Sequence, residues 1–207
     1  NKGIAAVNGI IPPGLKGFNK NQNIGYEYNP QRAQELLEEA GFPGGQGLPE
    51  IVLHTTEQYV DLADYMQNQL NKIGIPVKLE QAEGNLLYEM KVKQQSAFFR
   101  ASWIADYTDA ENYLMLFYGE NGVPPNYTRY SNSNYDALYE AAISEKDDKQ
   151  RAANYQRLDS MMMADAPIVP LYYDEVYRFV KNYVKGLGIN SMNMLNLKHV
   201  RFERESV

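Results

Sequence analysis

The amino-acid sequence predicts an α/β fold in which a mixed, largely parallel sheet is flanked by helices. Strand-like and helix-like segments alternate between residues 48 and 103, in the order strand, helix, strand, helix, strand. This order is typical of two βαβ units, whose strands run parallel. The chain has 207 residues, of which 44 % are hydrophobic, so it can bury a substantial core.

The first half of the chain carries a clear signal for each element. A helix is predicted over residues 30–40, because Asn29 is a favoured N-cap, Pro30 suits the first helical position and Gly41 can end the helix. Residues 1–28 contain glycines and prolines without a regular hydrophobic period, which is typical of an extended connecting segment. The remaining elements are strands over 48–54, 75–80 and 97–103 and helices over 57–72 and 86–93.

The second half is predicted to be mainly helical. A helix over 110–117 is followed by a turn-rich loop. Two further helices are expected, one capped by Ser133 or Asn134 and one by Asp147 or Asp148. Strands are predicted over 167–173, 177–184 and 197–202.

The run from residue 97 to residue 109 is the strongest candidate for a binding site. Its apolar part predicts a buried strand that ends just before Asp106 and Asp109. A carboxylate at such a place is costly unless a partner compensates it, and loops after strand ends are where open α/β sheets bind ligands. Asp109 fits the N-cap of the next helix, whereas for Asp106 a cap and a ligand contact both remain open. Arg100 fits either a surface pair with a glutamate or a contact with a ligand carboxylate.

Composition argues against several classes of function. The formal net charge is −6 and no cluster of Lys and Arg occurs, so no nucleic-acid partner is expected. The chain has no cysteine, and its two histidines, His54 and His199, are far apart in the sequence. No zinc motif, nucleophile elbow or phosphate-binding glycine loop is present, so we expect no metal, no cofactor and no enzymatic activity.

Seven segments of the chain, taken in order, resemble one family of transport receptors. Any one of them is weak evidence, but their order is specific. The chain is similar to the carboxyl-terminal lobe of a periplasmic solute-binding protein of the oligopeptide/dipeptide/nickel class, the receptor subunit of ABC importers. The segments that carry the resemblance are 9–14 (GIIPPG), 25–30 (GYEYNP), 33–42 (AQELLEEAGF), 69–75 (QLNKIGI), 103–107 (WIADY), 130–138 (YSNSNYDAL) and 165–173 (DAPIVPLYY).

The resemblance implies a periplasmic-binding-protein type II lobe. Residues 1–28 would be an extended connecting segment from a missing amino-terminal lobe, 29–185 the α/β ligand-binding lobe, and 186–207 the return segment and tail. The chain begins at Asn1 without an initiator Met or a signal-peptide pattern, so we expect it to be a processed or excised piece.

The implied function is the capture of peptides and their delivery to the permease of an ABC transporter. The protein would be periplasmic or extracytoplasmic, a lipoprotein anchored to the membrane through the absent amino terminus. Two alternatives remain open. The ligand could instead be a nickel complex, a sugar or another small solute, or the lobe could be the ligand-sensing domain of a regulator.

The resemblance also implies roles for individual residues. In peptide-binding members, a Trp-x-x-Asp signature supplies the carboxylate that pairs with the free α-amino group of the peptide. By motif this role falls to Asp106, with Trp103 flanking the ligand cleft or packing in the core. Tyr107, Asn126 and Tyr127 are candidate residues of the cleft wall. Without a facing lobe, we expect the carboxylate of Asp106 to be open to water.

Overall fold

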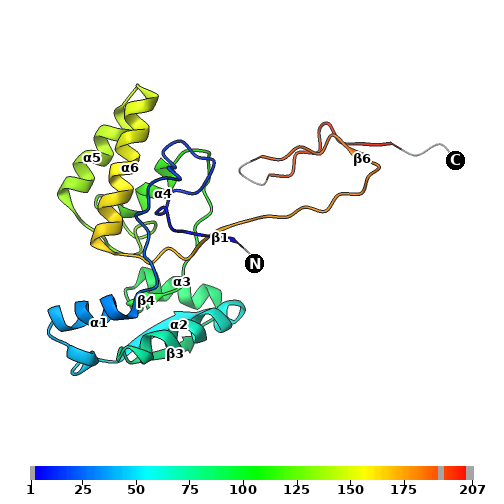
Figure 1. Ribbon diagram of the computed structural model, residues 1–207. Helices are drawn as coiled ribbons and strands as arrows, with labels where there is room; N and C mark the ends of the chain where they lie inside the picture. The colour runs from blue at the N-terminus through cyan, green and yellow to red at the C-terminus, as the bar shows by residue number, and fades with distance from the viewer. Residues whose placement is uncertain (1–2, 191–193, 204–207) are drawn as a thin grey trace. The chain divides into compact units, whose positions relative to one another are not determined.

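The computed structural model, which describes residues 3–190 and 194–203, contains a parallel sheet in the order β3–β2–β4 (Figure 1). Strand β2 (Ile51–Thr55) lies at the centre and pairs in parallel with β3 (Val77–Gln81) and β4 (Phe98–Phe99). The expected parallel sheet and its helical connections are therefore confirmed.

Helices connect and flank these strands. Helix α2 (Val60–Lys72), preceded by the 3-10 turn η2 (Glu57–Tyr59), joins β2 to β3, and α3 (Gly84–Val92) joins β3 to β4. Residues of α2 and the sheet form a small aliphatic core. Its buried members are Leu53, Ala63 and Val77, against which Met66, Leu70, Ile75, Leu79 and Phe98 pack.

Helix α1 (Pro30–Glu39) begins as its sequence predicts. The side chain of Asn29 accepts a hydrogen bond from the backbone N–H of Arg32 at 2.9 Å, so Asn29 is the N-cap. The helix is followed by the 3-10 turn η1 (Pro43–Gly45). These elements and the sheet form one continuous compact unit, Glu27–Trp103, which we call the sheet unit.

The second compact unit combines the residues up to Tyr26 with those from Ile104 onward, and we call it the helical unit. Both units contain residues of the range 29–185, which the sequence analysis treats as one lobe. The helical unit contains α4 (Glu111–Leu114), η3 (Met115–Phe117), α5 (Ser133–Ser144) and α6 (Asp148–Asp165). Short strands complete it: β1 (Gly3–Ala5) pairs antiparallel with β5 (Tyr172–Asp174), and β6 (Val184–Lys185) pairs with β7 (Arg201–Phe202).

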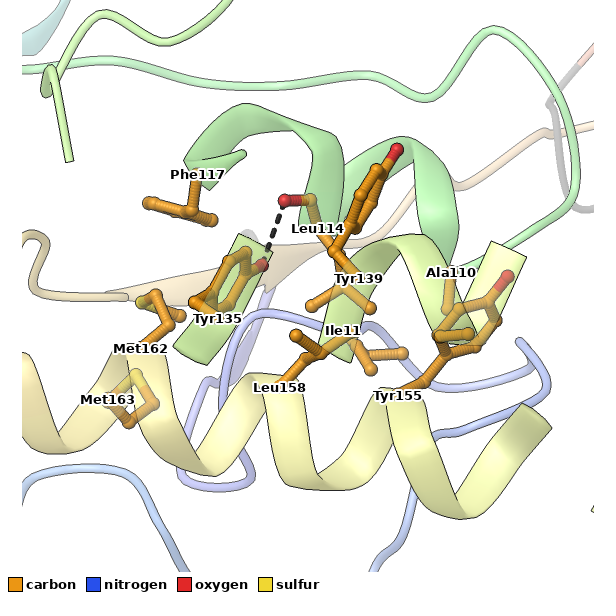
Figure 2. Close-up of a cluster of buried hydrophobic side chains, with 11 residues drawn as sticks. Ile11, Ala110, Leu114, Phe117, Tyr135, Tyr139, Tyr155, Leu158, Met162 and Met163 are labelled. Atoms are coloured by element: carbon orange, nitrogen blue, oxygen red, sulfur yellow. Dashed lines mark hydrogen bonds between the residues drawn. The ribbon is translucent and has the colours of Figure 1, made fainter. Parts of the chain in front are cut away.

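The core of the helical unit lies between α4, α5 and α6 (Figure 2). Three tyrosines are buried in it together with aliphatic residues and methionines. The fully buried Tyr135 points its hydroxyl at the backbone carbonyl of Leu114, to which it donates a hydrogen bond of 2.8 Å. The buried members are Ile11, Ala110, Leu114, Phe117, Tyr135, Tyr139, Ala142, Tyr155, Leu158, Met162 and Met163.

A buried carboxylate fastens the amino-terminal segment to this core. Asp159 of α6 is 2 % exposed and accepts hydrogen bonds from the backbone N–H groups of Ile10 at 3.0 Å and Ile11 at 3.3 Å. Gly9, at φ +102°, lies so close that a Cβ there would stand 2.3 Å from an oxygen of Asp159. Burial raises the pKa of Asp159 to about 6, although its two backbone hydrogen bonds lower it. The glycine at the start of the GIIPPG segment is therefore required by packing.

Several strands are shorter than the sequence predicts. The strand expected over 97–103 is limited to Phe98–Phe99, because β2 ends at Thr55 and the backbone N–H of Arg100 makes the last hydrogen bond to it, with His54 as acceptor. The strands expected over 167–173, 177–184 and 197–202 are likewise limited to β5, β6 and β7, whose bounds are given above. An apolar run indicates that a segment can form a strand. The length of that strand is set by how far the neighbouring strand extends and offers hydrogen bonds.

The expected helices fit better, with small shifts at their ends. Asp147 caps α6, as predicted, by accepting from the backbone N–H groups of Lys149 and Gln150. The cap of α5 is Asn132 rather than Ser133 or Asn134, because its side chain accepts from the backbone two and three residues onward. Parts of the predicted tail, 191–193 and 204–207, and residues 1–2 lie outside the described residues.

Candidate functional site

Asp106 lies on a short segment of the helical unit, residues 104–109, which we call the anchor loop. Burial alternates along its beginning, because Ala105 is buried whereas Ile104 and Asp106 are exposed. Ile104, the predicted last residue of a buried strand, is 83 % exposed, so the buried strand expected there is wrong. No described residue hydrogen-bonds or ion-pairs with the carboxylate of Asp106, and its exposure to water agrees with the expectation from sequence.

The backbone of the anchor loop is held by helix α4. The backbone N–H of Asp106 donates to the side-chain Oδ1 of Asn112 at 3.2 Å. Asn112 is fully buried, so this acceptor lies in the interior of the unit. The carboxylate of Asp106 is therefore exposed to solvent, while the hydrogen bond to Asn112 holds its main chain.

Asp109 is expected to be the N-cap of the next helix, but the N-cap position of α4 is Ala110, one residue further along the chain. The Oδ1 of Asp109 accepts from the backbone N–H of Glu111, the first residue of α4, at 3.0 Å, and its carbonyl accepts from the N–H of Asn112. Its second carboxylate oxygen lies 3.4 Å from Nη2 of Arg151 on α6. Asp109 is therefore fully engaged inside the protein.

Glu111 joins the anchor loop to the neighbouring helix α5. Its carboxylate accepts hydrogen bonds from the hydroxyls of Tyr107 and Tyr139. Burial first, and then Glu111, raises the pKa of both phenols, so both remain donors at neutral pH. Tyr107, a candidate wall residue, is 45 % exposed and thus combines a fixed hydroxyl with an accessible ring.

The other candidate residues lie in different surroundings. Trp103 is half-buried and is the last residue of the sheet unit, so it and Asp106 belong to different units. Tyr127 is half-buried in the loop before α5, where its carbonyl accepts from Arg129 at 3.4 Å. Arg100, for which a glutamate or a ligand carboxylate is expected, instead lies over the ring of Tyr59 at 3.4 Å from its centroid.

Asn126 is placed in the interior, not on a cleft wall. It is 2 % exposed, and its Nδ2 donates to the carbonyls of Tyr118 and Tyr130 at 3.3 and 2.9 Å. Its Oδ1 accepts from the hydroxyl of Thr128 and the backbone N–H of Tyr130, both at 3.1 Å. All of its hydrogen-bonding capacity closes the loop before α5, so we leave Asn126 out of the proposed ligand contacts.

The chain matches the family "Bacterial extracellular solute-binding proteins, family 5 Middle" over residues 1–125. It belongs to this family. Family 5 proteins bind solutes and are not enzymes, in agreement with the missing catalytic motifs. Among its relatives is the dipeptide-binding protein DppE of Bacillus subtilis, 28 % identical over 194 residues, which cover 92 % of this chain and 35 % of that protein.

Solved structures show the same fold. A structure of HbpA2 from Haemophilus parasuis matches 99 % of this chain and 41 % of its own with a TM-score of 0.86 at 24 % identity. The periplasmic binding protein DppA from Helicobacter pylori, associated with an ABC transporter and solved in complex with the peptide STSA, matches 98 % of this chain and 40 % of its own with a TM-score of 0.79 at 28 % identity. The chain thus spans about a third of the length of the first curated relative and about two fifths of these structures.

Some segments that carry the family resemblance serve the fold. Asp165 begins one of them and accepts hydrogen bonds from the hydroxyl of Tyr130 at 2.5 Å and from Nδ2 of Asn132 at 2.8 Å, both in another. These bonds lower the pKa of Asp165. Two family segments far apart in the sequence therefore meet in a structural contact.

Glu111 and Asn112 are two residues of the site that the sequence analysis misses. Glu111 lies four residues after Tyr107, but Tyr107 is in the anchor loop before α4, so helical spacing does not predict their contact. Asn112 gives no signal either, because an asparagine within a helical stretch is not by itself expected to be buried. In the described part of the chain no group of acidic or histidine side chains could hold a metal ion, and no helix is long and apolar enough to cross a membrane.

Proposed function

We propose that the whole protein containing this chain captures peptides, holding their free α-amino group on Asp106, and delivers them to an ABC transporter. One observation carries the proposal: an exposed carboxylate, with which no described residue makes a hydrogen bond or ion pair, stands on a loop whose main chain is hydrogen-bonded to a buried side chain. The two neighbouring carboxylates, Asp109 and Glu111, are engaged with protein groups, which leaves Asp106 as the acid available to a ligand.

The chemistry of the contact supports this ligand class. An ammonium group donates charge-assisted hydrogen bonds to a carboxylate, and these strengthen where a closing cleft excludes water. The remainder of a peptide would be held in an extended conformation by main-chain hydrogen bonds, which tolerate many side chains. We therefore expect weak preference for sequence and strong preference for a free amino terminus, with Trp103, Tyr107 and Tyr127 as candidate neighbours of the ligand.

Family membership supports the same function. DppE is named as a dipeptide-binding protein, and DppA from Helicobacter pylori was solved with a bound peptide. We propose accordingly that this chain is a carboxyl-terminal lobe, with residues 29–185 as its ligand-binding part and 186–207 as a return segment. Its partners would be the amino-terminal lobe of the same protein and the permease, at an extracytoplasmic location with a membrane anchor.

The decisive experiment compares two ligands on the full-length protein by titration calorimetry. Asp106→Ala should weaken binding of a free-amine dipeptide at least about tenfold and leave its N-acetylated analogue almost unchanged, because only the first has an ammonium group to lose. The matched control is Asp64→Ala, which removes another exposed aspartate, in the sheet unit. Equal losses for the two ligands would contradict the proposal.

A second measurement tests the ligand class directly. Mass spectrometry of the ligand that copurifies with the full-length protein should find peptides. A nickel complex or a sugar in their place would replace this proposal by binding of that solute.

A further inference from the structure

Asn112 has a position that suggests a role in binding, although it does not face solvent. It is fully buried on α4, and its Oδ1 is the acceptor for the backbone N–H of Asp106. We propose that Asn112 is a positioning residue that sets the selectivity of Asp106 for an ammonium group. This inference rests on the proposed function of Asp106 and adds a residue that makes the contact specific.

The first step of the argument is that the acceptor itself cannot move freely. The backbone N–H of Asn112 donates to the carbonyl of Asp109, and the side-chain Oδ1 of Asp109 accepts a hydrogen bond from the backbone N–H of Glu111. The carboxylate of Glu111 in turn accepts a hydrogen bond from the hydroxyl of Tyr139 on α5. The start of α4 is thus tied to the core on more than one side.

The second step concerns the anchor loop. Among the hydrogen bonds that connect it to α4, two involve the side of the loop that carries the acid: the backbone N–H of Asp106 donates to Asn112, and the hydroxyl of Tyr107 donates to Glu111. They fix two consecutive residues, while the carboxylate of Asp106 remains exposed. A group held in its binding geometry before the ligand arrives does not lose conformational freedom on binding, so its contact is stronger and more selective.

The third step predicts what loss of the acceptor would do. Without Oδ1, the N–H of Asp106 would face the interior without a partner, and the loop would turn to satisfy it. The carboxylate would then sample several orientations. Binding of a free-amine peptide would weaken, whereas binding of an N-acetylated peptide, which makes no ammonium contact, would change little.

The test uses Asn112→Leu, which keeps the number and branching of the side-chain heavy atoms and removes the acceptor. On the full-length protein, we expect calorimetry to show about fivefold to tenfold weaker binding of a free-amine dipeptide, with the ratio of N-acetylated to free-amine Kd reduced by the same factor. In an Asp106→Asn background the effect of Asn112→Leu should disappear, because it acts through that carboxylate. The control is Asn154→Leu, which removes another buried asparagine, on α6, whose Oδ1 accepts from Gln150.

The outcomes separate the two proposals. An unchanged ratio in Asn112→Leu together with a reduced ratio in Asp106→Asn would overturn the positioning role alone, whereas an unchanged ratio in Asp106→Asn would overturn the proposed function. A second measurement needs no variant of Asn112. The amide of Asp106 should exchange with deuterium markedly more slowly than an open loop amide, and exchange at the unprotected rate would overturn the inference.

Discussion

The two units differ in the chemistry of their interiors. The sheet unit has a small aliphatic core around Leu53. Its Lys–Glu ion pairs lie at the surface, and one buried side-chain hydrogen bond joins Ser96 to His54. The core of the helical unit includes three buried tyrosines, and a buried carboxylate fastens its first residues. Burial of a polar group is costly unless it is paired, so each such contact in the helical unit specifies one partner. We therefore expect the loss of a single polar group at the sites compared below to cost more stability in the helical unit than in the sheet unit.

The largest effect should come from Gly9→Ala. The new Cβ would collide with the carboxylate of Asp159, and alanine is strained at φ +102°. We expect a loss of about 4 kcal/mol or more in the free energy of unfolding, measured with urea. Gly14→Ala is the control, since Gly14 has φ +95° but no atom within 4 Å of its Cβ position, and should cost about 1 kcal/mol. Equal effects would show that Asp159 does not fasten the segment.

The second prediction concerns pH. The folded-state pKa of Asp159, about 6, lies above the unfolded value of about 3.9, so the folded chain binds this proton more tightly. The resulting stabilisation is complete below about pH 4 and is lost as pH rises through about 6; the loss is about 3 kcal/mol. Urea unfolding from about pH 4 to about pH 8 should show this contribution in the wild type. Asp159→Asn should flatten that part of the profile, and an identical profile would rule out Asp159 as its source.

A third prediction isolates one buried hydroxyl. Tyr135→Phe leaves the carbonyl of Leu114 without its donor inside the core, which should cost about 2 kcal/mol in urea unfolding. Tyr118→Phe removes a hydroxyl that donates to Glu140 at the surface, where water can replace it, and should cost less than about 0.5 kcal/mol. If both substitutions cost the same, burial of the hydroxyl is not what makes Tyr135 important.

The smallest effect is expected in the sheet unit. Tyr59→Leu removes the ring beneath the guanidinium of Arg100, a contact that water partly replaces, and should cost about 0.5 to 1 kcal/mol. The control Tyr65→Leu changes a tyrosine that is 61 % exposed and should be nearly neutral in the same measurement. A cost above that of Tyr135→Phe would reverse the comparison between the two units.

The same contrast explains what the sequence could predict. Local signals were sufficient for α1, because Asn29 and Pro30 mark its start and Gly41 follows its end, each directly beside the helix. They failed for β4, because the length of that strand depends on where β2 ends. Local signals also singled out Asp106, whose carboxylate is exposed, but they placed the N-cap of α4 at Asp109, whereas it is Ala110.

Contacts between residues far apart in the sequence could not be predicted from local patterns. The acceptor for Ile10 lies 149 residues away, on Asp159, and no pattern around either residue announces the pair. Asn112 and Asn126 show the same limit, because the type of residue does not reveal whether its amide is buried and saturated. Sequence therefore locates the acid of the proposed site but not the residues that hold it in place.

The separation of 149 residues between Ile10 and Asp159 also affects the order in which the protein folds during synthesis. Synthesis proceeds from the amino terminus at about 5 to 20 residues per second, so Ile10 is made about 7 to 30 seconds before Asp159. The whole sheet unit, Glu27–Trp103, is made during that interval and can fold first. The helical unit can attach its first residues only after α6 has been synthesised, so the hydrogen bonds to Asp159 form late in folding.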